Sequence, residues 1–270
     1  MHRSSIVAVV LTITLAGPAL AAPTLPGVNI RWDNCFADGG VMNKAFACDT
    51  NTGSDLAVLS LQLDTGMDHV SGVEIRISIK PATPTFPAWW EFQNSGSCRT
   101  SSLSFLASPM LPDGNCVGWG QGLEVGGFPS TGYHLGEDGS GGAVAYMVAA
   151  VPQSTLMTLD PITEYVVGTL RLDHVKTVGA GACGGCDTPV CILFSALRVT
   201  TSVPPAADRL FTEGANGAGS QIIHWQSAQL TNLVNNCTGT FACSTRFDCL
   251  AVSPTAARRN TWGEVKSLYR

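Results

Sequence analysis

Charged residues are scarce in this sequence, and no stretch of it is strongly basic. They make up 13% of the 270 residues, with few Lys and Glu among them, and the formal net charge is −5. An acidic chain without a basic stripe argues against nucleic acid as a partner. Beyond the first 21 residues no segment is apolar enough to cross a bilayer as a helix, so no membrane span is expected.

Motifs of catalysis are also missing. The sequence contains no Gly-x-Ser-x-Gly nucleophile elbow, no His-Glu-x-x-His motif and no phosphate-binding glycine loop. Its five histidines are scattered. Carboxylates are plentiful, so a glycosidase-type pair stays open, because such a pair forms in space and is not visible in sequence. We expect no catalytic residue and no cofactor.

The N-terminus is typical of a secretory signal peptide. Arg3 precedes an apolar stretch over residues 6–15, and Ala19-Leu20-Ala21 supplies the small residues of a cleavage site. A membrane anchor is the alternative, but the apolar stretch is too short and is broken at Gly17-Pro18. We expect cleavage after residue 21 and a secreted or extracytoplasmic mature chain.

Ten cysteines, all in the exported part, predict five structural disulfides in an oxidising compartment. They are Cys35, Cys48, Cys98, Cys116, Cys183, Cys186, Cys191, Cys237, Cys243 and Cys249. Their spacing favours local loops: Cys35 with Cys48, Cys98 with Cys116, and further pairing within each of the two later clusters.

The block Cys183-Gly-Gly-Cys186 has two other interpretations. A redox pair needs its thiols at the start of a helix, whereas Asp187-Thr-Pro189 and an apolar run follow here. A zinc site would need a fourth ligand beside Cys183, Cys186 and Cys191, for which His174 is the nearby candidate. Export favours structural cystines over both interpretations.

Alternating apolar and polar residues predict β-strands, and only the extreme C-terminus has a helical period. The strands are expected at 28–32, 59–63, 73–79, 143–151, from residue 165 onward, and at 190–199, with one or two more between 221 and 233. We expect 59–63 to pair with 73–79, and the run from Tyr165 to pair with 190–199, as antiparallel neighbours. The predicted fold class is all-β: one antiparallel β-sandwich over residues 22–252, cohesin- or immunoglobulin-like or jelly-roll-like, with disulfide-stapled loops.

Three tryptophans are candidate ligand contacts. Trp89, Trp90 and Trp119 lie in the least regular, Gly- and Pro-rich part of the sequence. If exposed they could stack on sugar rings, whereas buried tryptophans would fill the sandwich core, which is the favoured interpretation. Trp32 and Trp225 lie on predicted strands and are expected in the core.

Asp49, Asn51 and Asp55 have the alternating oxygens of a calcium-binding loop. The glycine of that pattern is displaced, however, and Ser60 stands where a carboxylate is needed. An Asx-rich turn ahead of a strand is favoured, and no metal is expected.

Residues 253–270 differ in character from the rest of the chain. Thr261 and Glu264 fit a capping box, which predicts a short C-terminal helix. This tail has a net charge of +3, whereas residues 22–252 carry −9. It could dock to an export or envelope component or be a mobile, solvated terminus. Its candidate contact residues are Trp262, Lys266, Tyr269 and Arg270.

Four stretches carry a resemblance to known proteins. They are FACDTNTG (46–53), WWEF (89–92), the cysteine block KTVGAGACGGCDTPVC (176–191) and the tail TWGEVKSLYR (261–270). Together they resemble a group of uncharacterised secreted bacterial β-sandwich proteins over most of the mature chain. The resemblance brings no known activity, so no functional residue is taken from it.

A more distant resemblance concerns strand pattern alone. The segments VSGVEI (70–75) and VGTLRL (167–172) are similar to parts of cohesin-like and carbohydrate-binding sandwiches. Such a similarity implies the fold and does not establish a function.

These observations favour a secreted, non-enzymatic binding or structural module of the bacterial envelope or extracellular space, with another protein as its partner. A carbohydrate-binding module is the alternative, and it predicts that at least two of the three loop tryptophans are exposed and coplanar. A glycoside hydrolase-like enzyme ranks third, and it predicts two carboxylates facing each other across a cleft.

Overall fold

The computed structural model describes residues 26–94, 96–108, 111, 116–137, 141–161, 163–202, 207–215, 217, 219–237 and 243–252. The predicted signal peptide (1–21) and the tail (253–270), with its expected helix, lie outside these residues. The described chain is nearly all β, which confirms the predicted fold class. It contains two short 3-10 turns, η1 (Ala88–Trp90) and η2 (Gln153–Thr155), and in its described parts no helix long and apolar enough to span a membrane.

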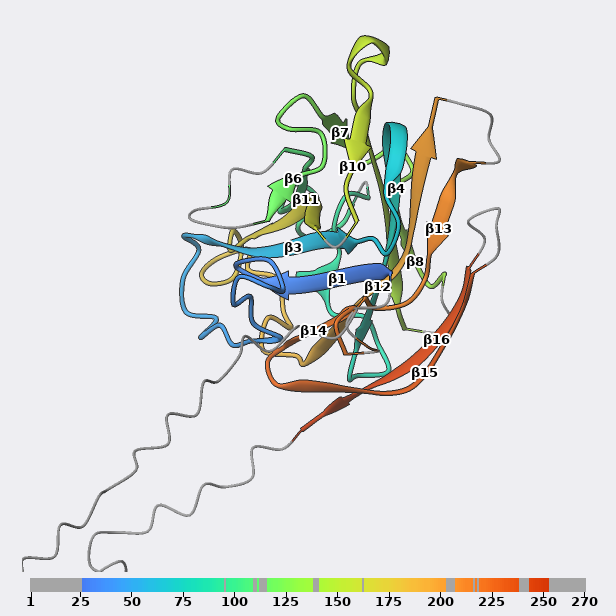
Figure 1. The fold of residues 1–270 in the computed structure, drawn as a ribbon. Helices are drawn as coiled ribbons and strands as arrows, with labels where there is room; N and C mark the ends of the chain where they lie inside the picture. The colour runs from blue at the N-terminus through green and yellow to red at the C-terminus, as the bar shows by residue number, and fades with distance from the viewer. Residues whose placement is uncertain are drawn as a thin grey trace, which may run out of the picture.

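One layer of the fold is a five-stranded sheet (Figure 1). Its order is β1 (Gly27–Trp32), β3 (Ser54–Gln62), β11 (Glu164–Asp173) and β5 (Leu103–Leu106), with β6 (Val117–Gly118) also paired to β11. All its ladders are antiparallel except that of β6 with β11.

The second layer is a nine-stranded sheet. Its main order is β2 (Asn43–Lys44), β14 (Ile222–Trp225), β12 (Val190–Thr201), β4 (Met67–Pro81), β9 (Ala143–Ala150) and β7 (Val125–Gly127). Three short strands join it at the sides: β13 (Arg209–Phe211) beside β12, β10 (Met157–Leu159) beside β4, and β8 (Tyr133–Leu135) beside β9.

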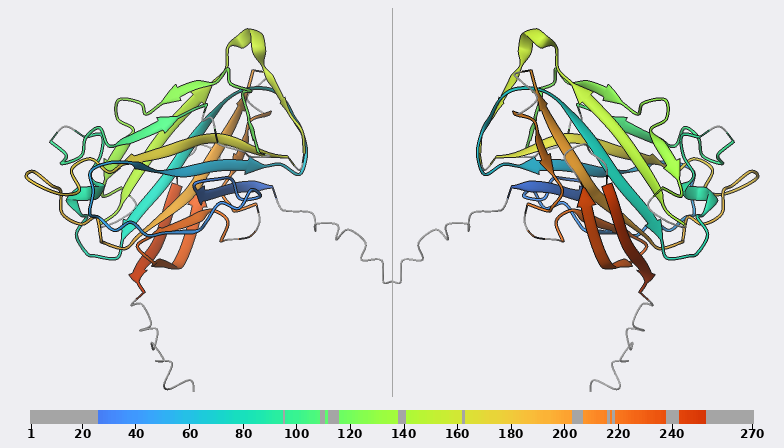
Figure 2. Two further views of the ribbon diagram at one scale, coloured as in Figure 1. Left: turned by 90° about the vertical axis from the view of Figure 1, so that its left-hand side faces the viewer. Right: turned by 90° about the vertical axis from the view of Figure 1, so that its right-hand side faces the viewer.

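The two sheets pack face to face, and their strands cross, as the two side views in Figure 2 show. A single large apolar cluster fills the space between them and takes residues such as Leu59 and Leu61 from β3, and Ile75 and Ile77 from β4. Every second residue of these strands points inward, so each sheet buries one face against the other. This arrangement is sandwich-like.

Strand β12 is buried on both faces. Ile192 and Phe194 point into the space between the sheets, whereas Cys191 and Leu193 belong to a second apolar cluster on the outer face. That outer face is covered by a two-stranded ribbon of β15 (Ala228–Cys237) and β16 (Cys243–Ala251), whose Phe247 packs into the second cluster. Burial on both faces explains why the sequence of β12 reads as a nearly continuous apolar run.

Both strand pairings predicted from neighbouring segments are wrong. β3 pairs with β1 and β11 in the five-stranded sheet, whereas β4 pairs with β12 and β9 in the other sheet. β11 and β12 are likewise in different sheets. The Gly-, Asp- and Pro-rich connections reverse the chain, but they carry it from one sheet to the other instead of closing hairpins.

The expected five disulfides are present, and none of the ten cysteines is free. They are Cys35–Cys116, Cys48–Cys186, Cys98–Cys183, Cys191–Cys249 and Cys237–Cys243. The structural interpretation of the cysteine block is therefore confirmed, because its sulfurs are not available as thiolates for redox chemistry or zinc.

Most of the predicted local pairings are wrong. Cys35 does not pair with Cys48, Cys98 does not pair with Cys116, and each cysteine of the 183–191 block pairs outside it. Only the last cluster contains an internal pair. A disulfide requires close α-carbons, and the crossing of the chain between sheets brings distant segments to that distance: the α-carbons of Cys48 and Cys186 are 5.9 Å apart.

Candidate binding site

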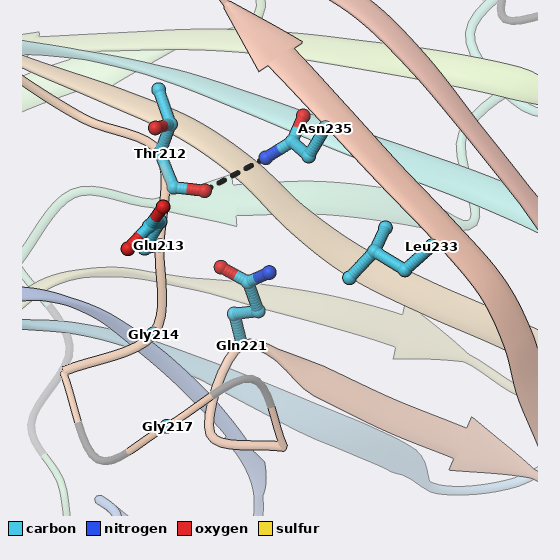
Figure 3. Close-up of a pocket in the computed structure, with 7 residues that line it drawn as sticks. All are labelled: Thr212, Glu213, Gly214, Gly217, Gln221, Leu233 and Asn235. Carbon is cyan, nitrogen blue, oxygen red and sulfur yellow. Dashed lines mark hydrogen bonds between the residues drawn. The ribbon is translucent and has the colours of Figure 1, made fainter.

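A cavity of about 360 Å³ opens between the β13–β14 connection and strand β15 (Figure 3). The connection supplies one wall and the ribbon the other. The lining residues are Thr212, Glu213, Gly214, Gly217, Gln221, Leu233 and Asn235. Because Leu233 and Asn235 are two positions apart on β15, their side chains lie on the same face of the ribbon.

The wall formed by the connection is held in place by strand β1. The Val28 amide donates to the Glu213 carbonyl at 2.9 Å, and the Ile30 amide donates to the Ser220 carbonyl at 2.8 Å. The guanidinium of Arg31 also donates to the Ser220 carbonyl, at 3.1 Å. Gly214 permits a close approach, since a Cβ there would lie 2.3 Å from the Gly217 carbonyl oxygen. The cavity therefore has a wall fixed by the core sheet.

Asn235 joins the two walls. Its side-chain amide donates to the carbonyls of Ser195 and Thr212, each at 2.8 Å, and its Oδ1 accepts from the Thr245 hydroxyl at 2.8 Å. The bond to Thr212 is drawn in Figure 3. Both amide hydrogens of Asn235 are thus used inside the protein, so this residue shapes the cavity.

Gln221 is the lining residue whose polar group is not satisfied. It is only 3% exposed, and its Oε1 is buried with no hydrogen-bond partner among the described residues. In Figure 3 its carboxamide extends into the space between Glu213 and Leu233. A buried acceptor without a donor costs about 1–3 kcal/mol, which a donor from a ligand would recover.

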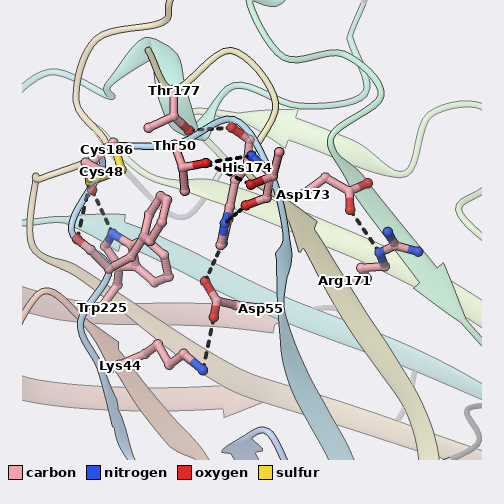
Figure 4. Close-up of polar contacts among 12 residues, drawn as sticks. Lys44, Cys48, Thr50, Asp55, Arg171, Asp173, His174, Thr177, Cys186 and Trp225 are labelled. Atoms are coloured by element: carbon pink, nitrogen blue, oxygen red, sulfur yellow. Dashed lines mark hydrogen bonds and ion pairs between the residues drawn. A yellow bond between two sulfur atoms is a disulfide. The ribbon is translucent and has the colours of Figure 1, made fainter.

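A second polar cluster surrounds His174 (Figure 4). The ring Nε2 lies 2.8 Å from Asp55 Oδ2, and Nδ1 lies 2.9 Å from the Thr52 carbonyl oxygen. Phe46 stacks on the imidazole with ring centroids 3.9 Å apart. Both ring nitrogens are occupied by protein groups, so neither is free to act as a general base in this arrangement.

Lys44 extends the same cluster to the surface. Its Nζ lies 3.0 Å from Asp55 Oδ1 and 2.7 Å from Asp33 Oδ2. Burial lowers the pKa of Lys44, but hydrogen bonds to the Asp33 and Asp55 carboxylates outweigh burial and leave this pKa raised. The cluster ties β2 and the segment before β3 to the end of β11.

The three candidate tryptophans are buried. Trp89 and Trp90 are 0% exposed and Trp119 is 1% exposed. Trp89 stacks against Trp225 in the core, with ring centroids 5.4 Å apart. The core interpretation is confirmed, and a stacking platform for sugars built from these residues is wrong, because their faces are covered by protein.

The calcium-loop candidates do not converge on an ion site. Asp55 pairs with His174 and Lys44, as above, and Asn51 Oδ1 accepts from the amides of Thr177 and Val178. Within the described residues, the metal-like grouping that does occur is Cys35, Asp38 and Cys116, whose two sulfurs form a disulfide. It therefore offers no thiolate to a metal.

No motif or pattern in the sequence indicates this cavity. Gln221 begins the stretch 221–233, in which one or two strands are expected, whereas Glu213 and Asn235 lie outside the predicted strands. Their convergence depends on the return of β15 over the outer face of the nine-stranded sheet, and periodicity does not show it.

Comparisons with protein-family models, with curated proteins and with solved structures found no match for this chain.

Proposed function

We propose that this protein is an exported, non-enzymatic binding module that holds part of a partner protein in the cavity beside Gln221. The observation that carries this proposal is the buried, unsatisfied Gln221 Oε1 at a cavity whose other walls are fixed. Ligand sites are typically concave and largely preformed, with a few polar groups that fix orientation. The five disulfides support an oxidising, extracytoplasmic location.

Selection of displayed random peptides on the oxidised full chain tests this proposal. Leu233→Trp would fill the cavity, and Val234→Trp is the matched control, because Val234 is the next residue of β15, on the opposite face, and is 50% exposed. We expect selected peptides to lose binding to Leu233→Trp and to keep it on Val234→Trp. Peptides that bind both variants equally, or a failure to select any peptide on folded protein, would contradict the proposal.

A further inference from the structure

The cavity is acidic. Glu213 is the charged side chain among its lining residues, and it is exposed. No Lys, Arg or His lines the cavity in the described part of the chain. A carboxylate in a concave site attracts a positively charged group.

The cavity contains a buried acceptor, Gln221 Oε1, and an exposed carboxylate, that of Glu213. The side-chain hydrogens of Asn235 are used by the Ser195 and Thr212 carbonyls, and the Gly217 amide donates to the Gly214 carbonyl. Gln221 Oε1 has no donor among the described residues, and the Glu213 carboxylate accepts only. A ligand that satisfies these two acceptors must therefore bring donors.

One wall is apolar. Leu233 faces the carboxamide of Gln221 across the cavity in Figure 3. Lysine and arginine combine an aliphatic stem, which packs on apolar surface, with a charged end that only donates hydrogen bonds. A hydroxyl-rich ligand would supply donors as well, but it would leave Glu213 without a counter-charge and Leu233 without an apolar contact.

From these three observations we infer that the cavity binds a basic side chain, Arg or Lys, of a partner polypeptide. The charged end contacts Glu213 and donates to Gln221 Oε1, and the stem lies along Leu233. This inference rests on the proposed function and adds the chemical class of the ligand.

Titration with short defined peptides, followed by nuclear magnetic resonance, tests it. The probes are acetylated and amidated Gly-Gly-X-Gly-Gly, in which X is arginine, lysine, glutamate or citrulline, the neutral analogue of arginine with nearly the same shape. We expect the Arg and Lys peptides to shift the backbone amide signals of Gly214 and Gly217 and the side-chain amide signals of Gln221. Citrulline should bind about tenfold more weakly, since charge-assisted hydrogen bonds are about twice as strong as neutral ones.

Two variants make the test specific. Glu213→Gln should weaken the Arg peptide about fivefold, in the range of a partly exposed ion pair, and leave the citrulline peptide unchanged. Asp49→Asn also removes an exposed carboxylate, but one that does not line the cavity, and should have no effect.

Equal binding of arginine and citrulline peptides, or a stronger response to glutamate, would overturn the inference. The inference would also be overturned if the peptides selected earlier lost binding to Leu233→Trp but contained no basic residue. In that case the proposed function would still stand. If neither the defined nor the selected peptides respond to filling the cavity, the proposed function fails as well.

Discussion

Arg99 shows how a single buried cation organises an irregular part of this chain. It is 1% exposed and lies over the Trp89 ring, 3.5 Å from its centroid. Its guanidinium donates to the carbonyls of Val175 at 3.0 Å, of Trp89 at 2.7 Å, and of Asp173. Desolvation lowers the pKa of Arg99 to about 9, and the Asp173 charge opposes this shift. The residue links the loop after η1 to the end of β11.

Replacing Arg99 by Met should lower the free energy of unfolding by about 3 kcal/mol or more, because three carbonyls lose their donor inside the protein. Arg171→Met is the matched control. Arg171 is 48% exposed and pairs with Asp173 Oδ1 at 2.9 Å, so its loss should cost no more than about 1 kcal/mol. Denaturant unfolding of the oxidised proteins measures both values. Equal losses would show that the carbonyl contacts of Arg99 contribute little.

His224 is expected to make the stability of the fold depend on pH. Its Nδ1 lies 3.0 Å from Asn43 Oδ1. Burial, and secondarily the charge of Arg31, lowers its pKa from the ordinary value of 6.5. As the pH falls below about 6.5, the unfolded chain gains a proton that the folded chain resists, so stability declines until the folded protein is also protonated.

We expect the melting temperature to fall between pH 7 and pH 5, and His224→Gln to reduce that fall. Because linkage limits one proton to about 1.4 kcal/mol per pH unit, the effect stays modest. His69→Asn, at an exposed histidine on β4, is the control and should retain the pH dependence of the parent chain. Parallel pH curves for the parent and His224→Gln would refute the assignment to His224.

At the scale of elements, alternation in the sequence predicted the positions of strands better than the strands with which they pair. Apolar alternation over 28–32, 59–63 and 73–79 corresponds to β1, β3 and part of β4. Alternation shows which residues of a strand are buried, but not which sheet the strand belongs to. Because both sheets bury a face in the same core, their strands have the same pattern, and the pairing partners could not be predicted. Strand β16 was not among the predicted strands, although its buried Thr245, Phe247 and Cys249 alternate with exposed residues.

The ribbon of β15 and β16 is both a cover of the nine-stranded sheet and a wall of the cavity. Its attachment depends on Phe247, which is 4% exposed, and on hydrogen bonds such as that from Arg76 to the Thr245 hydroxyl at 3.1 Å. The sequence does not reveal this docking, because it joins residues about 170 positions apart. The candidate binding site is therefore a property of tertiary packing.

Phe247→Ala should destabilise the ribbon by about 3 kcal/mol, since a large buried aromatic is lost. We expect faster amide hydrogen exchange in β15 and β16 than in β3 and β11, which lie in the five-stranded sheet. Leu250→Ala, at a residue 51% exposed on the same strand, is the control and should leave exchange nearly unchanged. Uniform acceleration over all strands would mean that the ribbon unfolds only with the whole molecule.

At the scale of the whole molecule, disulfides connect parts that the sheets alone do not join. Cys48–Cys186 links residues 138 apart, whereas Cys237–Cys243 closes a loop of only six. Export and composition predicted the number of cystines, but their partners depend on the crossing of the chain between sheets.

Removing Cys48–Cys186 with two alanines should cost about 4 kcal/mol, and removing Cys237–Cys243 about 2 kcal/mol, because a longer loop leaves more freedom to the unfolded chain. The other cystines shorten the effective loop that Cys48–Cys186 closes, and the value of about 4 kcal/mol takes this shortening into account. Unfolding in denaturant without reductant measures both losses, with a thiol assay confirming that eight cysteines stay oxidised. A larger loss for the short loop would contradict the entropic explanation.

The cystine connectivity also has a consequence for biosynthesis. If the chain is exported as proposed, its cysteines emerge from an export channel one after another. Only Cys237–Cys243 joins two that are consecutive in the sequence. An oxidase that links neighbouring thiols as they appear would first join Cys35 to Cys48, which is not a native pair. Native pairing then depends on thiol–disulfide exchange after Cys183 and Cys186 have emerged. In a host that oxidises thiols quickly, we therefore expect the yield of this protein to rise with disulfide isomerase activity.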